Sequence, residues 1–155
     1  MSFNKNLIDS FVNITSKAAI SCFEYLGKND KNLADKAATD EMRKNLNLLD
    51  IDGKVVIGEG ELDEAPMLYI GEKLGTGNGP SLDIAVDPLE GTNFAAKNLP
   101  GALSVMAVSK KGNLFNAPET YMNKLAVSAD VPFDATDLDF DLSLIHISEP
   151  TRLVS

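Results

Sequence analysis

The segment LDIAVDPLEGTN, residues 82–93, restricts the fold of this chain more than any other stretch. It begins with a run of mostly apolar residues, which is typical of a buried strand in a layered sheet. We expect that strand to end at Asp87, because Pro88 cannot donate a hydrogen bond to a ladder. A turn at this point brings Asp87 and Glu90 to one side, Gly91 permits a sharp bend, and Thr92 is suited to cap a following helix.

Carboxylates beside the start of a helix are suited to hold a divalent cation, while the helix N-terminus receives a phosphate. For Asp87-Pro88 alone, a strand that ends in a polar turn is the alternative interpretation. A second acidic strand end favours the metal site, because Glu59 lies between two glycines directly after the β-branched run of residues 55–57. If the two strands are neighbours in one sheet, Glu59 and Asp87 share a crevice in which layered α/β proteins bind ligands. A solvated charge run is the alternative for GEGELDE, residues 58–64.

Two helices are expected before these strands. Apolar residues recur at steps of three and four between Leu7 and Leu26, which predicts a helix that Gly27 ends. Residues 27–46 predict a polar turn and a second helix with Asp35 in its first turn, where complementing the helix dipole is the simplest role. Further along, we expect short helices at residues 65–74 and 117–125, a loop at 75–81 and a strand at 102–108.

Composition limits the possible partners. The net charge of −9 argues against nucleic acid or an anionic membrane, because no basic stripe is available to neutralise phosphates. A single cysteine excludes an internal disulfide and favours a reducing compartment. The N-terminus lacks a signal-peptide pattern and no apolar run approaches the length of a membrane span, so the sequence predicts a soluble cytoplasmic protein.

Several long strings together resemble the class II fructose-1,6-bisphosphatase family, the bacterial type associated with glycerol and gluconeogenic metabolism. The matching strings are GKNDKNLADKAA, DGKVVIGEGELDEAPMLYIGEKLGTG, LDIAVDPLEGT and NAPETYMNKL. The DPLEGT element is also similar to the signature of the wider lithium-sensitive phosphatase superfamily, which includes inositol monophosphatases. The resemblance implies an α/β fold, an α-β-α-β-α layered sandwich, and a phosphatase that uses two or more Mn²⁺ or Mg²⁺ ions.

The resemblance also implies roles for individual residues. Four acids match the family's metal ligands, namely Asp35, Glu59, Asp87 and Glu90, so Asp35 is assigned to the metal rather than to the helix dipole. Four positions match those that contact the phosphorylated sugar, namely Glu90, Gly91, Thr92 and Tyr121. Thr92 is the expected catalytic group that orients or deprotonates the attacking water, and Asp63 is a second catalytic candidate.

The sequence departs from the family pattern in two ways. The family's chain continues for about as long again, with a further glutamate ligand and much of the sugar-binding surface. From about Leu144 the pattern stops, and SLIHISEPTR resembles a translated sequencing-adapter read-through. We therefore expect residues 1–142 to be the N-terminal metal- and phosphate-binding half of a phosphatase, and residues 143–155 to be a disordered non-native tail.

The expected reaction of the parent protein is hydrolysis of fructose 1,6-bisphosphate to fructose 6-phosphate and phosphate, with this truncated chain itself inactive. Sedoheptulose 1,7-bisphosphatase and inositol monophosphatase activity are alternatives within enzymes. A non-catalytic metal-binding fragment is the alternative from another class. A sugar bisphosphate is the expected partner, and the full-length protein is expected to be a homo-oligomer.

Overall fold

A computed structural model describes residues 4–59, 67–115, 123, 125–132 and 137–139. The chain divides into two compact units, residues 1–117 and 118–155, and every helix and strand of the described residues belongs to the first. The predicted boundary at residues 142/143 stays a prediction. The expected helix at 117–125 lies for the most part outside the described residues.

The first helix, α1, spans Lys5–Ser21 and begins where the side chain of Asn4 accepts a hydrogen bond from the backbone N–H of Leu7 at 2.8 Å. It ends earlier than the apolar spacing predicts. The remaining turn is the 3₁₀ helix η1, Phe23–Tyr25, which keeps the spacing of three but not the α-helical hydrogen bonds. Gly27 follows with a φ of 72°, so it does stop the helical segment as expected.

The second helix, α2, spans Lys31–Leu46. Its N-cap is Asp30, whose carboxylate accepts hydrogen bonds from the backbone N–H groups of Asn32 and Leu33. Asp35 therefore lies in the second turn, and its predicted place in the first turn is wrong. Because Asp30 already satisfies the helix start, Asp35 is left free for another role.

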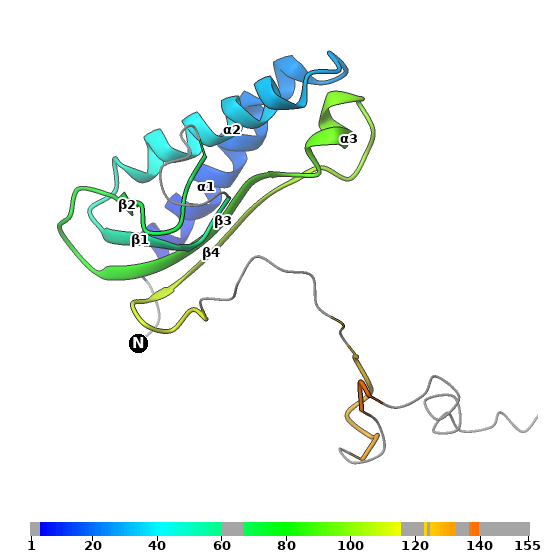
Figure 1. The fold of residues 1–155 in the computed structure, drawn as a ribbon. Coiled ribbons are helices and arrows are strands. Elements are labelled where there is room, and N and C mark those ends of the chain that lie inside the picture. The colour runs from blue at the N-terminus through cyan, green and yellow to red at the C-terminus, as the bar shows by residue number, and fades with distance from the viewer. Residues whose placement is uncertain (1–3, 60–66, 116–122, 124, 133–136, 140–155) are drawn as a thin grey trace, which may run out of the picture. The chain divides into compact units, whose positions relative to one another are not determined.

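Within the described residues, four strands form one mixed sheet in the order β2-β1-β3-β4, and Figure 1 shows their arrangement. Their bounds are β1 Asp52–Ile57, β2 Lys73–Leu74, β3 Ser81–Glu90 and β4 Leu103–Lys110. β1 and β3 are parallel neighbours, whereas β2 and β4 are antiparallel to the strands beside them. The helix predicted over 65–74 is wrong in its described part, because Leu74 pairs with Gly53 and forms β2 at the sheet edge.

β3 does not end at Asp87 as predicted. It continues through Pro88 to Glu90, and its pairing with β4 shifts register between Asp87 and Glu90. The shift is a β-bulge, which is one of the few places in a sheet where a proline is tolerated. The five-residue helix α3, Thr92–Ala96, then connects β3 to β4.

The core lies between the sheet and the helices α1 and α2, which cover one of its faces (Figure 1). Its largest fully buried side chains include Met42, Leu46, Leu82 and Ile84. Among the described residues, the other sheet face is open, since Leu103 is 60% exposed and Val105 45%.

The predicted α/β class is confirmed. The described residues supply one helix layer and one sheet layer of the expected sandwich. Within them, no helix is both long and apolar enough to cross a bilayer.

Candidate metal centre

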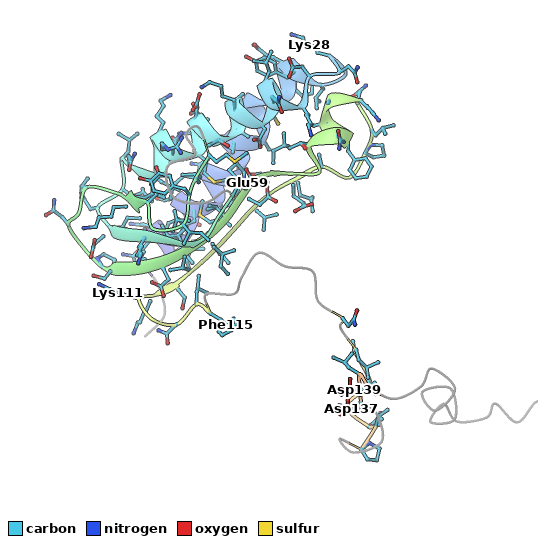
Figure 2. The ribbon with its side chains drawn as sticks, in the orientation of Figure 1. Lys28, Glu59, Lys111, Phe115, Asp137 and Asp139 are labelled. Carbon is cyan, nitrogen blue, oxygen red and sulfur yellow. The ribbon has the colours of Figure 1, made fainter. Side chains whose placement is uncertain are left out.

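The four predicted metal ligands come from three segments that meet at one end of the sheet. Asp35 lies on α2, Glu59 follows β1, and Asp87 and Glu90 belong to the bulge of β3. Because β1 and β3 run parallel as neighbours, with Ile57 opposite Ala85, their carboxyl ends bring Glu59 beside Asp87. The expectation that the two acidic strand ends share one sheet edge is confirmed. Figure 2 shows Glu59 between α2 and the sheet.

The bulge sets the orientation of Asp87. One of its carboxylate oxygens, Oδ1, accepts a hydrogen bond from the backbone N–H of Leu89 at 3.1 Å across Pro88. Ladder pairing resumes at Glu90, opposite Leu103. A bulge can redirect side chains in this way without breaking the strand, and here it keeps Asp87 and Glu90 close enough to share a hydrogen bond.

The carboxylates raise one another's pKa. Burial and, after it, the negative charges of Asp35 and Asp87 raise the pKa of Glu59 to about 8. Burial and then a hydrogen bond with Glu90 raise the pKa of Asp87 to about 6, and burial also raises the pKa of Asp35. Each shift reflects the cost of holding a negative charge away from water and beside other negative charges. Positive charge brought into this cluster would remove that cost.

Two carboxylate oxygens are buried without any hydrogen-bond partner among the described residues. They are Oδ1 of Asp35 and Oε2 of Glu59. A buried acceptor normally has a partner, and an unpaired one costs free energy. Oxygen atoms left in this state, in a group made only of carboxylates, have the chemistry that Mg²⁺ and Mn²⁺ select.

These carboxylates have the right chemistry to bind a cation, but their side chains are not placed as a coordination shell. Within the part of the chain that the structure describes, no three acidic, histidine or cysteine side chains lie close enough together to hold a metal ion. Side-chain rotation, or ligands from elsewhere, would be needed to complete a coordination shell. Asp63, a predicted catalytic residue in the acidic segment after Glu59, lies outside the described residues, as does Tyr121.

Gly91 and Thr92 follow the bulge directly. Gly91 has a φ of 79° and is the N-cap of α3, without a side-chain cap hydrogen bond, so the predicted capping role of Thr92 is wrong. Thr92 is instead the first helical residue, and its hydroxyl is not used as a cap. A Cβ on Gly91 would lie 3.0 Å from a ring carbon of Phe94. Both the left-handed backbone and the close approach therefore require glycine here.

The loop before α2 is fastened to α3. The backbone N–H of Gly27 donates to the carbonyl of Ala95 at 3.1 Å, and that of Asn29 donates to Ala96 at 2.8 Å. These bonds join the segment that carries Asp35 to the one that follows Glu90. The positions of two candidate ligands are thus linked through backbone contacts.

Two features of the site were not predicted from the sequence. Thr39, one helical turn after Asp35, is 1% exposed, and its hydroxyl has no hydrogen-bond partner in the part of the chain that the structure describes. Arg43, one turn further, donates to Glu72 at 2.7 Å and to the carbonyl of Met67. This contact holds the described residues just before β2 against α2. In the sequence, the contact is indicated only by an arginine beside the buried face of α2. Residue spacing does not show that its partners are Met67 and Glu72.

A family model for bacterial fructose-1,6-bisphosphatase, glpX-encoded, matches residues 5–146. The fructose-1,6-bisphosphatase 1 class 2 of Escherichia coli K12 is 54% identical over 123 residues, which cover 79% of this chain and 37% of that protein. The D-fructose 1,6-bisphosphatase class 2/sedoheptulose 1,7-bisphosphatase of Synechococcus sp. CC9902 matches with the same identity and coverage.

A Prochlorococcus marinus protein (strain MIT 9515) with the same double name is 52% identical over 123 residues. Among solved structures, an extragenic suppressor from Pyrococcus furiosus matches 69% of this chain and 41% of its own, at 20% identity and a TM-score of 0.47. The chain thus spans 37% of the length of these curated relatives.

Proposed function

Because the chain belongs to the bacterial, glpX-encoded fructose-1,6-bisphosphatase family, we propose that it supplies metal-binding carboxylates for hydrolysis of fructose 1,6-bisphosphate. The products are fructose 6-phosphate and inorganic phosphate, in gluconeogenesis. The proposal concerns a protein of the relatives' length, since this chain spans 37% of them. The observation that carries it is that Glu59, at the end of β1, interacts electrostatically with the other three predicted ligands, Asp35, Asp87 and Glu90.

The family is metal-dependent in general. Asp35, Glu59, Asp87 and Glu90 would hold two or more Mn²⁺ or Mg²⁺ ions. When bound, such ions neutralise phosphoryl charge and lower the pKa of a coordinated water. The raised pKa values of Glu59 and Asp87 mean that both must release protons before they act as ligands, so metal affinity rises with pH.

The remaining roles belong to residues around the bulge. Gly91 allows the backbone to approach a phosphate closely, because it has no side chain. The hydroxyl of Thr92 orients the attacking water, and the water's proton passes, directly or through this hydroxyl, to the carboxylate of Asp63. Glu90 and Tyr121 contact the phosphorylated sugar. These assignments follow the family resemblance and are proposals for this chain.

Metal binding is the first test, because it does not require turnover. We would titrate the chain with Mn²⁺ and follow free Mn²⁺ by electron paramagnetic resonance. Asp87→Asn removes one charge from the cluster and should weaken binding by about tenfold or more. The matched control is Asp52→Asn, at the opposite end of the same pair of strands, where the carboxylate accepts a hydrogen bond from Ser81. Equal affinities in both variants would contradict the assignment.

Thr92 is tested by activity in a protein of the relatives' length. Thr92→Val keeps the shape of the side chain without the hydroxyl, whereas Thr92→Ser keeps the hydroxyl. A positioning or proton-transfer role contributes about a hundred- to ten-thousand-fold, so we expect Val to be crippled and Ser to be partly active. If the two variants hydrolysed the substrate equally well, Thr92 would have no chemical role.

Sedoheptulose 1,7-bisphosphate is a second candidate substrate. The Synechococcus and Prochlorococcus relatives carry this activity in their names, at 54% and 52% identity. Phosphate release from both bisphosphates and from inositol monophosphate, measured side by side, would separate the candidates. Activity towards neither sugar bisphosphate would contradict the proposed function.

The 155-residue chain alone is expected to show no turnover. Although the candidate ligands lie at one end of the sheet, no three of the described ones are placed to hold a metal ion, and one sheet face is open among the described residues. A metal-binding fragment without catalysis is the corresponding alternative function for the chain by itself. Metal-dependent phosphate release from a monodisperse sample would refute this expectation. The single cysteine, Cys22, is buried and unpaired, which supports a reducing compartment such as the cytoplasm.

A further inference from the structure

Residues 67–72, which precede β2, are held along the C-terminal half of β1 by backbone hydrogen bonds. The N–H of Val55 donates to the carbonyl of Glu72 at 2.9 Å. Beyond the end of the strand, the N–H of Glu59 donates to the carbonyl of Leu68 at 3.1 Å. The segment therefore bonds directly to the backbone of one predicted metal ligand, Glu59.

The contact between this segment and Glu59 is close. A Cβ on Gly58 would lie 2.2 Å from the carbonyl oxygen of Leu68, the same oxygen that accepts the hydrogen bond from Glu59. The side chain of Leu68 is fully buried. Two stretches of backbone approach this closely only where no side chain separates them. A displacement of residues 67–72 would therefore move the backbone of Glu59 with it.

Arg43 holds the same segment from the side of α2. Its Nε and Nη2 donate to the two carboxylate oxygens of Glu72, at 2.7 and 3.2 Å, and Nη2 also donates to the carbonyl of Met67. The ion pair is largely buried, since the side chain of Arg43 is 24% exposed and that of Glu72 is 11% exposed. A forked contact of this kind fixes direction as well as distance. Arg43 thus contacts both ends of the segment whose middle bonds to Glu59.

We propose that Arg43 is a positioning residue for the metal centre, and that it sets the place of Glu59 relative to Asp35. Asp35 lies on α2 two helical turns before Arg43, so one helix carries both a predicted ligand and the side chain that positions another. Arg43 acts through the backbone of residues 67–72. This inference rests on the proposed metal-binding function of the carboxylates and adds a residue on which their geometry depends.

The charge of Arg43 and its position predict opposite effects on metal binding. Arg43 and Asp35 are about 12 Å apart along the helix axis, which exceeds the screening length of about 8 Å at physiological salt. Through charge alone, removal of Arg43 would leave cation binding unchanged or make it slightly tighter, because a positive charge is lost. Through position, its removal releases residues 67–72 and weakens binding. The direction of the change therefore separates the two roles.

The first measurement is the Mn²⁺ affinity of the full chain, followed by electron paramagnetic resonance. Arg43→Gln should weaken binding about tenfold, as is usual for residues that orient metal ligands. The matched control is Lys17→Gln, which also removes one positive charge and one hydrogen bond to α2, from Nζ to Oδ1 of Asn45 at 2.7 Å. This control should change the affinity less than about twofold. Unchanged or tighter binding in Arg43→Gln would overturn the proposal, as would equal weakening by both substitutions.

The second measurement is amide hydrogen exchange in the absence of metal, resolved by nuclear magnetic resonance. In Arg43→Gln, the N–H of Glu59 should exchange about tenfold faster relative to the N–H of Asp52, because only the first depends on residues 67–72. The N–H of Asp52 donates to the carbonyl of Pro80 at 3.0 Å, at the other end of β1. If Arg43 served only overall stability, both groups would exchange faster by the same factor, and the proposal would be overturned.

The two measurements also separate this inference from the proposed function. A chain that bound no Mn²⁺ would contradict the proposed function, whereas the exchange ratio would still decide the role of Arg43. Arg43→Lys keeps a positive charge beside Glu72, so it provides a second variant in case Arg43→Gln does not fold. Lysine cannot donate two parallel hydrogen bonds to a carboxylate. Its Mn²⁺ affinity and exchange ratio should fall between those of the unmodified chain and Arg43→Gln, and unmodified values of both would overturn the proposal.

Discussion

Replacing Thr39 by valine should stabilise this protein. The hydroxyl of Thr39 is buried in α2, with the residue 1% exposed, and has no hydrogen-bond partner among the described residues. A buried hydroxyl without a partner costs about 1–3 kcal/mol by mutational measures. Valine has nearly the same shape and adds a methyl group in place of the oxygen. We therefore expect a gain of about 1 kcal/mol or more, or roughly 3–5 °C in Tm for a domain of this size.

The assay is urea and thermal unfolding of the metal-free chain, followed by far-ultraviolet circular dichroism. Thr15→Val is the matched control, because the hydroxyl of Thr15 donates to the carbonyl of Val12 at 3.0 Å and its loss should not stabilise. Thr39→Ser keeps the hydroxyl, removes a buried methyl and should destabilise by about 1 kcal/mol. A destabilised Thr39→Val would refute the reasoning, since it would mean that the hydroxyl has a favourable partner.

Two further predictions concern buried acids. Because the pKa values of Glu59 and Asp87 are raised to about 8 and about 6 from ordinary values of 4.5 and 3.8, their protonated forms favour the folded state. This stabilising contribution is complete at acidic pH and is lost as the pH rises through 6 and then 8. The unfolding free energy of the chain, measured in the presence of a chelator, should therefore fall over that range. It should fall less in Glu59→Gln, which cannot ionise at this position. A flat profile would contradict it. Asp83, 4% exposed, accepts a hydrogen bond from the backbone N–H of Gly112 at 2.6 Å, so Asp83→Ala should cost about 1–3 kcal/mol in urea unfolding and Asp83→Asn less. Equal losses of unfolding free energy in the two variants would show that the hydrogen bond to the side-chain oxygen of residue 83 does not stabilise the fold.

The location of the site could be predicted because it depends on strand ends. Each of two apolar runs is followed by an acid, and parallel pairing of neighbouring strands brings Glu59 and Asp87 together. Asp35 was different, since spacing alone placed it at the helix start. Only the family resemblance assigned Asp35 to the metal. The structure shows that Asp30 forms the N-cap of α2, so Asp35 is not at the start of the helix.

The wrong predictions of local structure share one cause, because strand pairing in the folded protein overrides the local preference of the sequence. Pro88 predicts a strand end, but the ladder with β4 resumes at Glu90 and absorbs the proline in a bulge. Residues 73 and 74 have no strand pattern of their own and are extended because β1 offers them an edge. Thr92 has a good side chain for a cap, yet the left-handed Gly91 takes that position.

The register of β3 and β4 also sets the order in which the sheet can assemble. At the bulge, Glu90 meets Leu103 across the short connection that contains α3, whereas Leu82 meets Lys110 only across the whole length of both strands. Closing a short loop costs less entropy than closing a long one, so pairing should begin at the bulge and proceed away from it. The parallel partner β1 should join last, since the acidic segment after Glu59 and β2 both lie between Asp52 and Ser81 in the sequence. Pairing at the bulge brings Asp87 and Glu90 together before Glu59 arrives with β1. A divalent ion that neutralises these two acids should therefore speed folding as well as stabilise its product.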